Sequence, residues 1–192
     1  MAMKPPSHNP EDTEIASAFT VRQYQHARDA KDREVIAEAI RRRFTERYIQ
    51  PASKPTERHG FTMMAISCLM IEAFISLQKG WKTSDGKGEL AVSLFFDGSD
   101  HFREFRGHGK AFYKNVRCGI LHQAETNEGW KIVRTGSLFD LGSHTINADL
   151  FLPKLKEVLD AFCDKLKTLD WNGPEWKSVR KKMNAICENC KP

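Results

Sequence analysis

Apolar residues recur every three to four positions along much of the chain, which is the spacing of one face of an α-helix. In residues 11–49 this pattern predicts one long helix that breaks near Arg28. The apolar positions with the clearest helical spacing in this segment are Val35, Ile36, Ala39, Ile40 and Phe44. Pro51 and Pro55 follow, and we expect them to end the helix because proline has no backbone N–H to donate.

Residues 56–79 are apolar on nearly every face. A helix of that kind must be surrounded by other elements, because it has no polar side to turn toward water. We therefore expect residues 61–77 to form the most buried helix and the centre of the core. The glycines that follow predict a loop, and after a short apolar segment we expect a charged turn at residues 97–109.

The second half of the chain combines further helices with one short β segment. Helical spacing predicts a helix at residues 110–124, one that begins at Leu150 or Pro153, and one at residues 174–187. Residues 129–148 instead have short apolar runs punctuated by glycine, which is typical of a small β-hairpin or an ordered loop. The sequence therefore predicts a mainly α fold, a helical bundle with a small β-hairpin insertion near residues 129–148.

The size of the chain suits one domain, since 192 residues with 40% hydrophobic content can bury one core rather than two. We expect residues 1–10, which contain three prolines, to form a disordered lead and residues 11–192 to form a single domain. Neither an uninterrupted run of roughly eighteen apolar residues nor an N-terminal signal segment is visible. This predicts a cytoplasmic protein without a membrane span.

The net charge of +5 favours polyanionic partners without requiring them. Two basic runs carry much of this charge: Arg41 to Arg43 together with Arg47, and residues 177–182. Each run falls on a predicted helix, where basic residues usually form a solvated face.

Five cysteines, an odd number, lie mostly within apolar helical patterns and suit reduced thiols better than a disulfide framework. Cys187 and Cys190 have the C-x-x-C spacing of half a zinc site, but no second pair lies nearby in the sequence, which favours free thiols. The glycine-rich motifs of phosphate-binding and dinucleotide-binding loops are missing as well. We expect neither a metal nor a cofactor.

One arginine and one histidine interrupt the apolar helix predicted for residues 110–124. Arg117 and His122 are separated by four residues, a spacing that Arg103 and His108 repeat in the charged turn. The spacing alone therefore has little weight. The first pair differs from the second because its apolar surroundings make an unpaired charge costly.

A partner for these cations is available inside the chain. Glu72 is the one charged residue between positions 61 and 78, and a carboxylate in a core helix should be paired or neutral. We therefore predict that Glu72 lies within ion-pair reach of Arg117 or His122. A structural ion pair and a functional site both fit this prediction.

The stretch NVRCGILHQAE, downstream of an apolar helix with a lone glutamate, resembles the HEPN superfamily (higher eukaryotes and prokaryotes nucleotide-binding) over residues 56–169. Members are small helical bundles that commonly form homodimers, and many are metal-independent endoribonucleases with an arginine and a histidine near the dimer interface. The site that the resemblance implies has Arg117 and His122 as catalytic residues and Glu72, Asn115 and Cys118 as supporting residues. Cys118 departs from the family pattern, in which a polar residue often follows the arginine.

The chemistry of RNA cleavage fits these residue types. Without a metal it needs a base for the 2′-hydroxyl proton, an acid for the leaving 5′-oxygen and a cation for the phosphate. Histidine suits either proton transfer, and arginine suits the phosphate oxygens. On a regular helix Arg117 and His122 point about 140° apart. They converge only if the helix bends, for which Gly119 offers a place, or if a two-fold dimer adds a second copy of each group.

Two functions follow from these observations. The first is a dimeric endoribonuclease of HEPN type, which by resemblance is a toxin or phage-defence effector whose partner is an antitoxin or a nucleotidyltransferase. The second is a HEPN-like module, catalytically weak because of Cys118, that binds a nucleotide, RNA or a protein.

Overall fold

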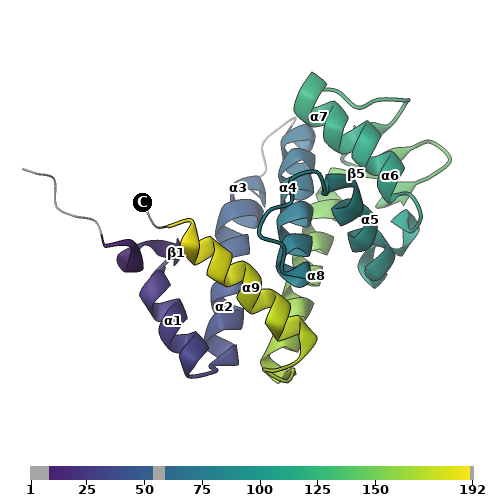
Figure 1. Ribbon diagram of the computed structural model, residues 1–192. Helices are drawn as coiled ribbons and strands as arrows, with labels where there is room; N and C mark the ends of the chain where they lie inside the picture. The colour runs from purple at the N-terminus through teal and green to yellow at the C-terminus, as the bar shows by residue number, and fades with distance from the viewer. Residues whose placement is uncertain (1–8, 54–58, 191–192) are drawn as a thin grey trace, which may run out of the picture.

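Helices make up most of the computed structural model, which describes residues 9–53 and 59–190 (Figure 1). Small groups of strands lie near the N-terminus and ahead of the last two helices. The predicted mainly α fold with a small β insertion is therefore confirmed. Of the disordered lead expected for residues 1–10, only Asn9 and Pro10 are described, and Pro10 opens a short 3₁₀ helix, η1 (Pro10–Asp12).

The N-terminal region is a pair of strands followed by two helices, so the predicted break is confirmed, but the prediction of a helix from residue 11 is wrong. The two strands pair antiparallel. The break between the helices falls slightly after the position expected near Arg28. The elements of this region are β1 (Glu14–Ala16), β2 (Phe19–Thr20), α1 (Val21–Asp29) and α2 (Arg33–Phe44).

Short polar side chains set these helix boundaries. Thr20 begins α1 through a capping box with Gln23, in which each side chain accepts a hydrogen bond from the other's backbone N–H. After α1, Lys31 has a left-handed φ of 56°, which no helix can continue through. The Asp32 side chain then accepts a hydrogen bond from the Val35 N–H and begins α2.

The chain continues from α2 through a π-helical turn, η2 (Thr45–Ile49), into α3 (Gln50–Ser53). Pro51 therefore does not end the helix, contrary to the prediction. The wider π turn shifts the backbone hydrogen-bond ladder directly before the proline, which has no N–H to contribute to it. Pro55, the second predicted stop, lies outside the described residues.

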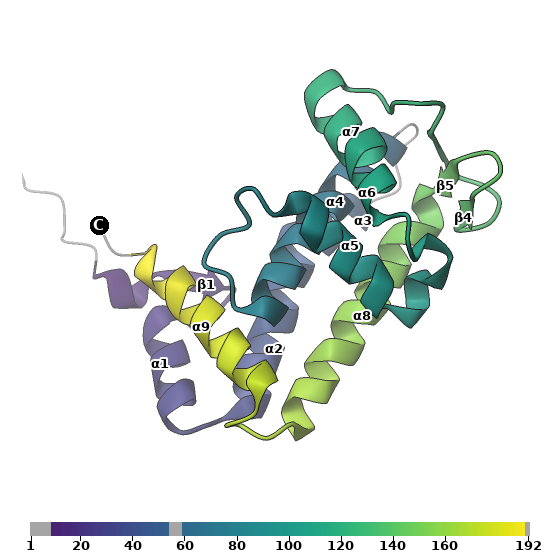
Figure 2. The ribbon, with the colours of Figure 1, turned by 45° about the vertical axis from the view of Figure 1, so that its right-hand side comes forward.

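The central helix is α4 (Gly60–Lys79), as predicted for residues 61–77. Within that stretch only Thr62 and Leu69 are exposed. The helices that pack against α4 include α5 (Gly88–Gly98), α8 (Ala148–Thr168) and α9 (Pro174–Glu188) (Figure 2). By length and composition α4 could cross a membrane, but 67% of its most apolar window is buried inside the protein, as in a core helix.

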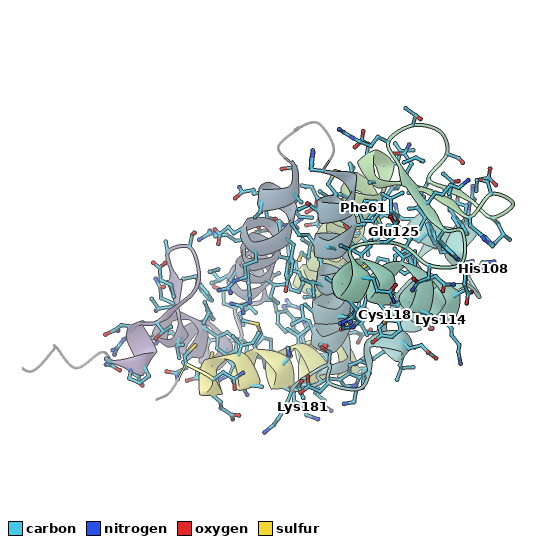
Figure 3. The ribbon with its side chains drawn as sticks, turned by 90° about the horizontal axis from the view of Figure 1, so that it is seen from above. Phe61, His108, Lys114, Cys118, Glu125 and Lys181 are labelled. Carbon is cyan, nitrogen blue, oxygen red and sulfur yellow. The ribbon has the colours of Figure 1, made fainter. Side chains whose placement is uncertain are left out.

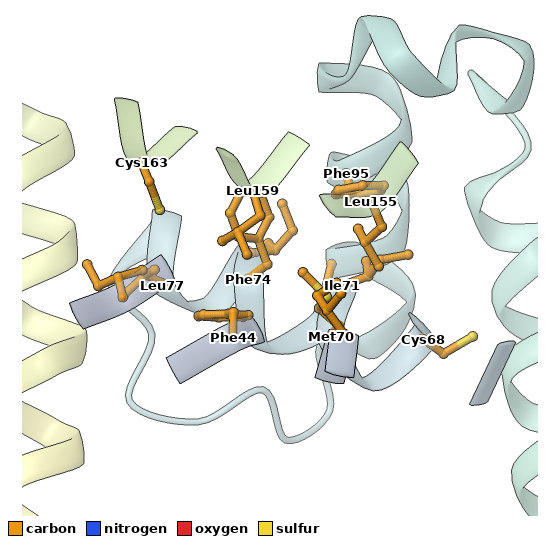
Figure 4. Close-up of a cluster of buried hydrophobic side chains, with 14 of the residues drawn as sticks. Phe44, Cys68, Met70, Ile71, Phe74, Leu77, Phe95, Leu155, Leu159 and Cys163 are labelled. Carbon is orange, nitrogen blue, oxygen red and sulfur yellow. The ribbon is translucent and has the colours of Figure 1, made fainter. Parts of the chain in front are cut away.

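Phe74 of α4 stands in the middle of the apolar core (Figure 4). Its ring centroid lies 6.1 Å from that of Phe44, 6.3 Å from that of Phe95 and 5.2 Å from that of Phe162. All three pairs have the edge-to-face geometry that aromatic rings prefer. The partners belong to α2, α5 and α8, so one side chain joins three helices to α4.

A second aromatic cluster covers the segment that was expected to be a charged turn. This segment forms a 3₁₀ helix, η3 (Asp100–Phe105), in which Phe102 and Phe105 are fully buried. The segment is kinked at Phe102, whose φ of −124° is not helical, and both rings are nevertheless enclosed in the core. Phe105 stacks on Phe96 at 4.6 Å and on Phe139 at 4.3 Å, which joins η3 to α5 and to the β insertion.

The β insertion is a three-stranded sheet rather than a simple hairpin. Its strands are β3 (Lys131–Val133), β4 (Phe139–Asp140) and β5 (Thr145–Asn147), in the order β3-β5-β4. The predicted hairpin is the antiparallel pair of β4 and β5. β3 pairs with β5 in parallel, and the paired residues are 14 positions apart in the sequence. Turn residues, which indicate pairing between adjacent strands, do not reveal such a pairing.

The last strand leads directly into α8. The Asn147 side chain accepts a hydrogen bond from the Asp149 N–H and so caps the helix at its start. The helix therefore begins at Ala148, earlier than the predicted Leu150 or Pro153.

Candidate functional site

The candidate site lies on an interrupted helix beside α4. α6 (Gly109–Phe112) continues through a π-helical turn, η4 (Tyr113–Arg117), into α7 (Cys118–Gln123), which together cover the helix predicted for residues 110–124. α7 lies against α4 (Figure 1). The π turn places Arg117 at its end, at the start of the regular helix that carries His122.

Arg117 forms an ion pair with Glu72 of α4, which confirms the predicted pairing. The Arg117 Nε donates to the Glu72 Oε1 at 2.7 Å. The two side chains are only 18% and 10% exposed, respectively. Burial lowers the pKa of Arg117, but the hydrogen bond and the negative charge of Glu72 outweigh it, so the pKa of Arg117 is raised overall. The pair therefore keeps the guanidinium charged and fixes its direction.

The hydrogen bond to Glu72 uses one edge of the guanidinium. Among the described residues, neither terminal nitrogen of Arg117 has a hydrogen-bond partner. The guanidinium carbon also lies 5.3 Å from the centre of the Tyr113 ring, a cation–π contact. An anchored arginine with its terminal N–H groups unused is suited to bind the oxygens of a phosphate.

Tyr113 was not among the site residues predicted from the sequence. The signal was present, because an aromatic residue one turn before an arginine on a helix can reach it. Packing fixes the ring in place: a β-carbon added at Gly88 would lie 2.5 Å from the ring of Tyr113, so α5 approaches the ring closely where it has no side chain. Burial raises the pKa of Tyr113, and the neighbouring Cys118 thiol contributes in the same direction.

His122 does not meet Arg117 within one chain. It lies in the last turn of α7, is exposed, and makes no hydrogen bond or ion pair with any described residue. His122 follows Arg117 by five positions, and the regular helix α7 between them turns the two side chains about 140° apart. None of five cavities found among the described residues is lined by either side chain.

Gly119 does not bend the helix between them, as the sequence had suggested. The irregular turn lies before Arg117, and Gly119 is inside the regular part. A β-carbon at Gly119 would lie 2.4 Å from the Glu125 carbonyl oxygen. The glycine therefore allows the loop after α7 to fold back tightly over the helix.

Asn115 belongs to the same loop closure rather than to the surroundings of Arg117. Its side-chain amide nitrogen donates to the Glu128 carboxylate at 3.1 Å. Its backbone carbonyl oxygen accepts a hydrogen bond from the Asn127 N–H at 2.9 Å. The exposed Glu128 also receives a hydrogen bond from Lys114, and these bonds lower its pKa. Cys118, labelled in Figure 3, is half-buried and interacts with Tyr113. Of the predicted supporting residues, Glu72 contacts Arg117 and Asn115 fastens the loop.

The second arginine–histidine match has different surroundings. The Arg103 side chain is 76% exposed, and its ion-pair partner is the adjacent Glu104 at 3.9 Å. His108 precedes α6 at the edge of the protein, with its ring 6.0 Å from that of Phe139 (Figure 3). Unlike Arg117, Arg103 has no buried counter-ion among the described residues, so this pair is the weaker candidate for a functional site.

All five cysteines are free thiols, including Cys187 and Cys190. Burial raises the pKa of Cys187 to about 11, and the Cys190 thiol donates to the Ile186 carbonyl at 3.4 Å. Within the described ranges, no three His, Cys, Asp or Glu side chains are grouped so that they could hold a metal ion. The C-x-x-C pair therefore finds no further ligands there.

Comparison with protein-family models, curated proteins and solved structures gives no match for this chain. What Arg117 and His122 can do therefore follows from their chemistry and surroundings. A guanidinium held by a carboxylate can bind an anion, and an exposed imidazole can transfer protons near neutral pH.

Proposed function

We propose that this protein is a metal-independent endoribonuclease of HEPN type, with Arg117 and His122 as its catalytic residues. The observation that carries the proposal is the anchored state of Arg117. Its Nε is held by Glu72, while its terminal nitrogens are unused among the described residues and an exposed histidine follows on the same helix. This combination supplies an anchored cation for phosphate and a solvent-exposed group for proton transfer.

The proposed reaction is attack of the ribose 2′-hydroxyl on the adjacent phosphorus. The new bond joins the 2′-oxygen to phosphorus, and the bond from phosphorus to the 5′-oxygen breaks. A base takes the 2′-hydroxyl proton and an acid gives a proton to the 5′-oxygen, while Arg117 stabilises the charge that develops on the phosphate oxygens. The products have 2′,3′-cyclic phosphate and 5′-hydroxyl ends.

A homodimer would complete this site, because one His122 cannot easily act as both base and acid. Two exposed apolar side chains support an interface at the α4–α7 face, by which we mean the exposed surface of these two helices. Leu69 on α4 is 43% exposed and Leu121, next to His122, is 38% exposed. A two-fold axis through this face would bring both copies of His122 toward one RNA strand.

The alternative function is a HEPN-like module that binds RNA, a nucleotide or a protein without efficient cleavage. The geometry that favours it is the divergence of Arg117 and His122 within one chain. Cys118 also supplies no strong hydrogen-bond donor after the arginine. In this case Arg117 would still bind phosphate, and His122 would have no role in chemistry.

The decisive experiment incubates the protein with total RNA in EDTA and identifies the ends of the products. We expect cleavage by the wild type, with 5′-hydroxyl ends. His122→Ala should reduce cleavage at least about 100-fold without changing the thermal midpoint, because this side chain is exposed and unpaired among the described residues. His26→Ala is the matched control, since His26 is also exposed in the last turn of a helix.

Arg117 needs a gentler substitution than alanine, because removal of its charge would strand Glu72. Arg117→Lys keeps the ion pair but removes the planar, two-pronged donor. It should lower cleavage while most of the stability is retained. Full activity of His122→Ala, or products with 5′-phosphate ends, would contradict the mechanism. RNA retention by the wild type without products would favour the binding module.

The dimer can be tested separately. Leu121→Lys should yield monomers in sedimentation experiments and lose cleavage, with an unchanged circular dichroism spectrum. If such a monomer cleaves RNA as fast as the wild type, the site does not need a second copy. In bacterial cells, the toxin or phage-defence role predicts growth arrest on expression of the wild type and none on expression of His122→Ala.

A further inference from the structure

The two basic runs of the sequence meet at one cavity. Arg43 lies on α2 and Lys182 on α9, and both line a cavity of about 250 Å³ bounded by α2, η2, α4 and α9. The full lining is Ile40, Arg43, Phe44, Tyr48, Ala73, Leu77, Lys182, Met183, Ile186 and Asn189. The fold thus brings two cations to one cavity although 138 residues lie between them in the sequence.

No carboxylate of a described residue balances these two charges. The lining contains no aspartate or glutamate, and neither cation forms an ion pair with a described residue. The Arg43 Nη1 donates to the Ile15 carbonyl, and the Lys182 Nζ donates to the Lys82 carbonyl at 2.9 Å. Burial lowers the pKa of Lys182, and repulsion by Arg43 lowers it further. An anion in the cavity would relieve both effects.

The neighbouring Arg41 shows that the lack of a counter-ion at Arg43 is particular to this cavity. Arg41 contacts Asp160 and Asp164, each at 2.6 Å, and Glu38 at 3.4 Å. Two residues further along the same helix, Arg43 contacts only backbone oxygen among the described residues. In this basic run, Arg41 is therefore paired with carboxylates, whereas Arg43 lines a cavity.

The rest of the lining combines apolar side chains with Tyr48 and Asn189. Phe44, Leu77 and Met183 are buried in the walls. Tyr48 packs its ring 5.6 Å from that of Phe44, and its hydroxyl has no hydrogen-bond partner among the described residues. The cavity therefore combines a cationic end, an unused hydroxyl and an apolar wall, which is the usual composition of a small-molecule site.

We propose that this cavity binds a small phosphate monoester with a flat aromatic ring in its body, its phosphate held by Arg43 and Lys182 and its ring against Phe44, Tyr48 and Met183. The volume lies just below the roughly 300 to 1,000 Å³ of pockets for drug-sized ligands, which limits the occupant to a small molecule. A nucleic-acid strand would instead need an open groove that follows its backbone. The site is separate from Arg117 and His122.

Adenosine monophosphate is a suitable probe, and the readout is binding to the full chain in isothermal titration calorimetry. We expect saturable binding of one molecule per chain, with weaker binding of adenosine, which lacks the phosphate, and of inorganic phosphate, which lacks the flat body. Because no cleavage is measured, failure here is distinguishable from failure of the proposed ribonuclease function.

Matched variants test the charges. Lys182→Gln should weaken binding at least about tenfold, equivalent to about 1.4 kcal/mol. Lys181→Gln removes the same charge from the adjacent, exposed position and should leave binding within about twofold of wild type (Figure 3). Arg43→Gln and Arg42→Gln form a second such pair on α2, where Arg42 is the exposed member.

A steric variant keeps the test independent of folding effects at the cations. Ala73 lines the cavity from α4, so Ala73→Met should block the probe while all charges stay in place. Several results would overturn the proposal: no saturable heat with millimolar adenosine monophosphate, equal weakening by Lys181→Gln and Lys182→Gln, or unchanged binding in Ala73→Met. Equal weakening accompanied by tight RNA binding would identify an open polyanion surface instead.

Discussion

Two arginines beside α4 have opposite electrostatic surroundings. Arg117, at the α4–α7 face, donates to a buried glutamate, and its pKa is raised. Arg43, on α2, faces a cavity whose described lining has no carboxylate, and burial together with repulsion by Arg47 lowers its pKa. The role of a cation therefore depends on which groups the fold places opposite it. Arg117 is fixed in direction, whereas Arg43 lacks a counter-ion among the described residues.

The two faces also differ in how closely they are packed. Near Arg117 the loop after α7 approaches Gly119 so closely that a β-carbon has no room. Near Arg43 a cavity of about 250 Å³ separates the helices. The first face is therefore closely packed, and the second has space for a ligand.

The largest expected effect compares removal of the two arginines. Arg117→Met leaves Glu72 as a buried charge without its partner and should lower the free energy of unfolding by about 3 to 5 kcal/mol. Arg43→Met leaves no carboxylate behind and loses mainly one hydrogen bond to the Ile15 carbonyl, so its loss should be less than half as large. Urea-induced unfolding measures both, and equal losses would break the comparison.

A smaller effect should follow from adding side-chain volume at each face. Gly119→Ala forces the Glu125 carbonyl to move and should cost about 1 to 3 kcal/mol, the usual penalty of overpacking. Ala73→Met extends into the cavity at the other face and should change the free energy of unfolding much less. The thermal midpoints of the two variants, measured against wild type in one buffer, give the ranking. A larger loss for Ala73→Met would mean that the cavity closes in solution.

The smallest effect is a pH dependence that arises at Lys182. Its pKa in the folded protein is lowered by burial and by Arg43, while in the unfolded chain it is about 10.4. Between these two pKa values the unfolded state binds more protons than the folded state, so the free energy of unfolding rises with pH. Below this window both states carry the charged ammonium, and the cost of burying it in the folded protein is fully present. Lys182→Gln should remove this rise and Lys181→Gln should keep it. Unfolding measured from pH 7 upward tests the difference, and identical profiles for the two variants would exclude it.

Much of the fold follows from local sequence patterns. The apolar spacing of residues 61–77 predicted the central helix because a segment without a polar face has to be enclosed. The pairing of Glu72 with Arg117 was predictable for a related reason, since a lone carboxylate in such a segment needs a cation. Both predictions depend on one element and its immediate requirement for burial or charge balance.

Other features depend on how elements pack, which local patterns do not encode. Phe102 and Phe105 were read as part of a charged turn, and only a 3₁₀ turn against α5 makes them core residues. His122 has the right spacing from Arg117, but the regular helix between them turns it outward.

The basic runs show the same limit most clearly. By sequence each run has the spacing and composition of a solvated helix face, and Arg41 to Arg43 differ in no way that predicts three different surroundings. The crossing of α9 over α2 and α4 brings Arg43 and Lys182 to one cavity and leaves Lys181 exposed. The sequence by itself determined which segments are helical and which charge needs a partner, because those properties arise within a turn or two of chain. Only the tertiary structure decided which cations share a space, because that depends on the angles at which distant helices pack.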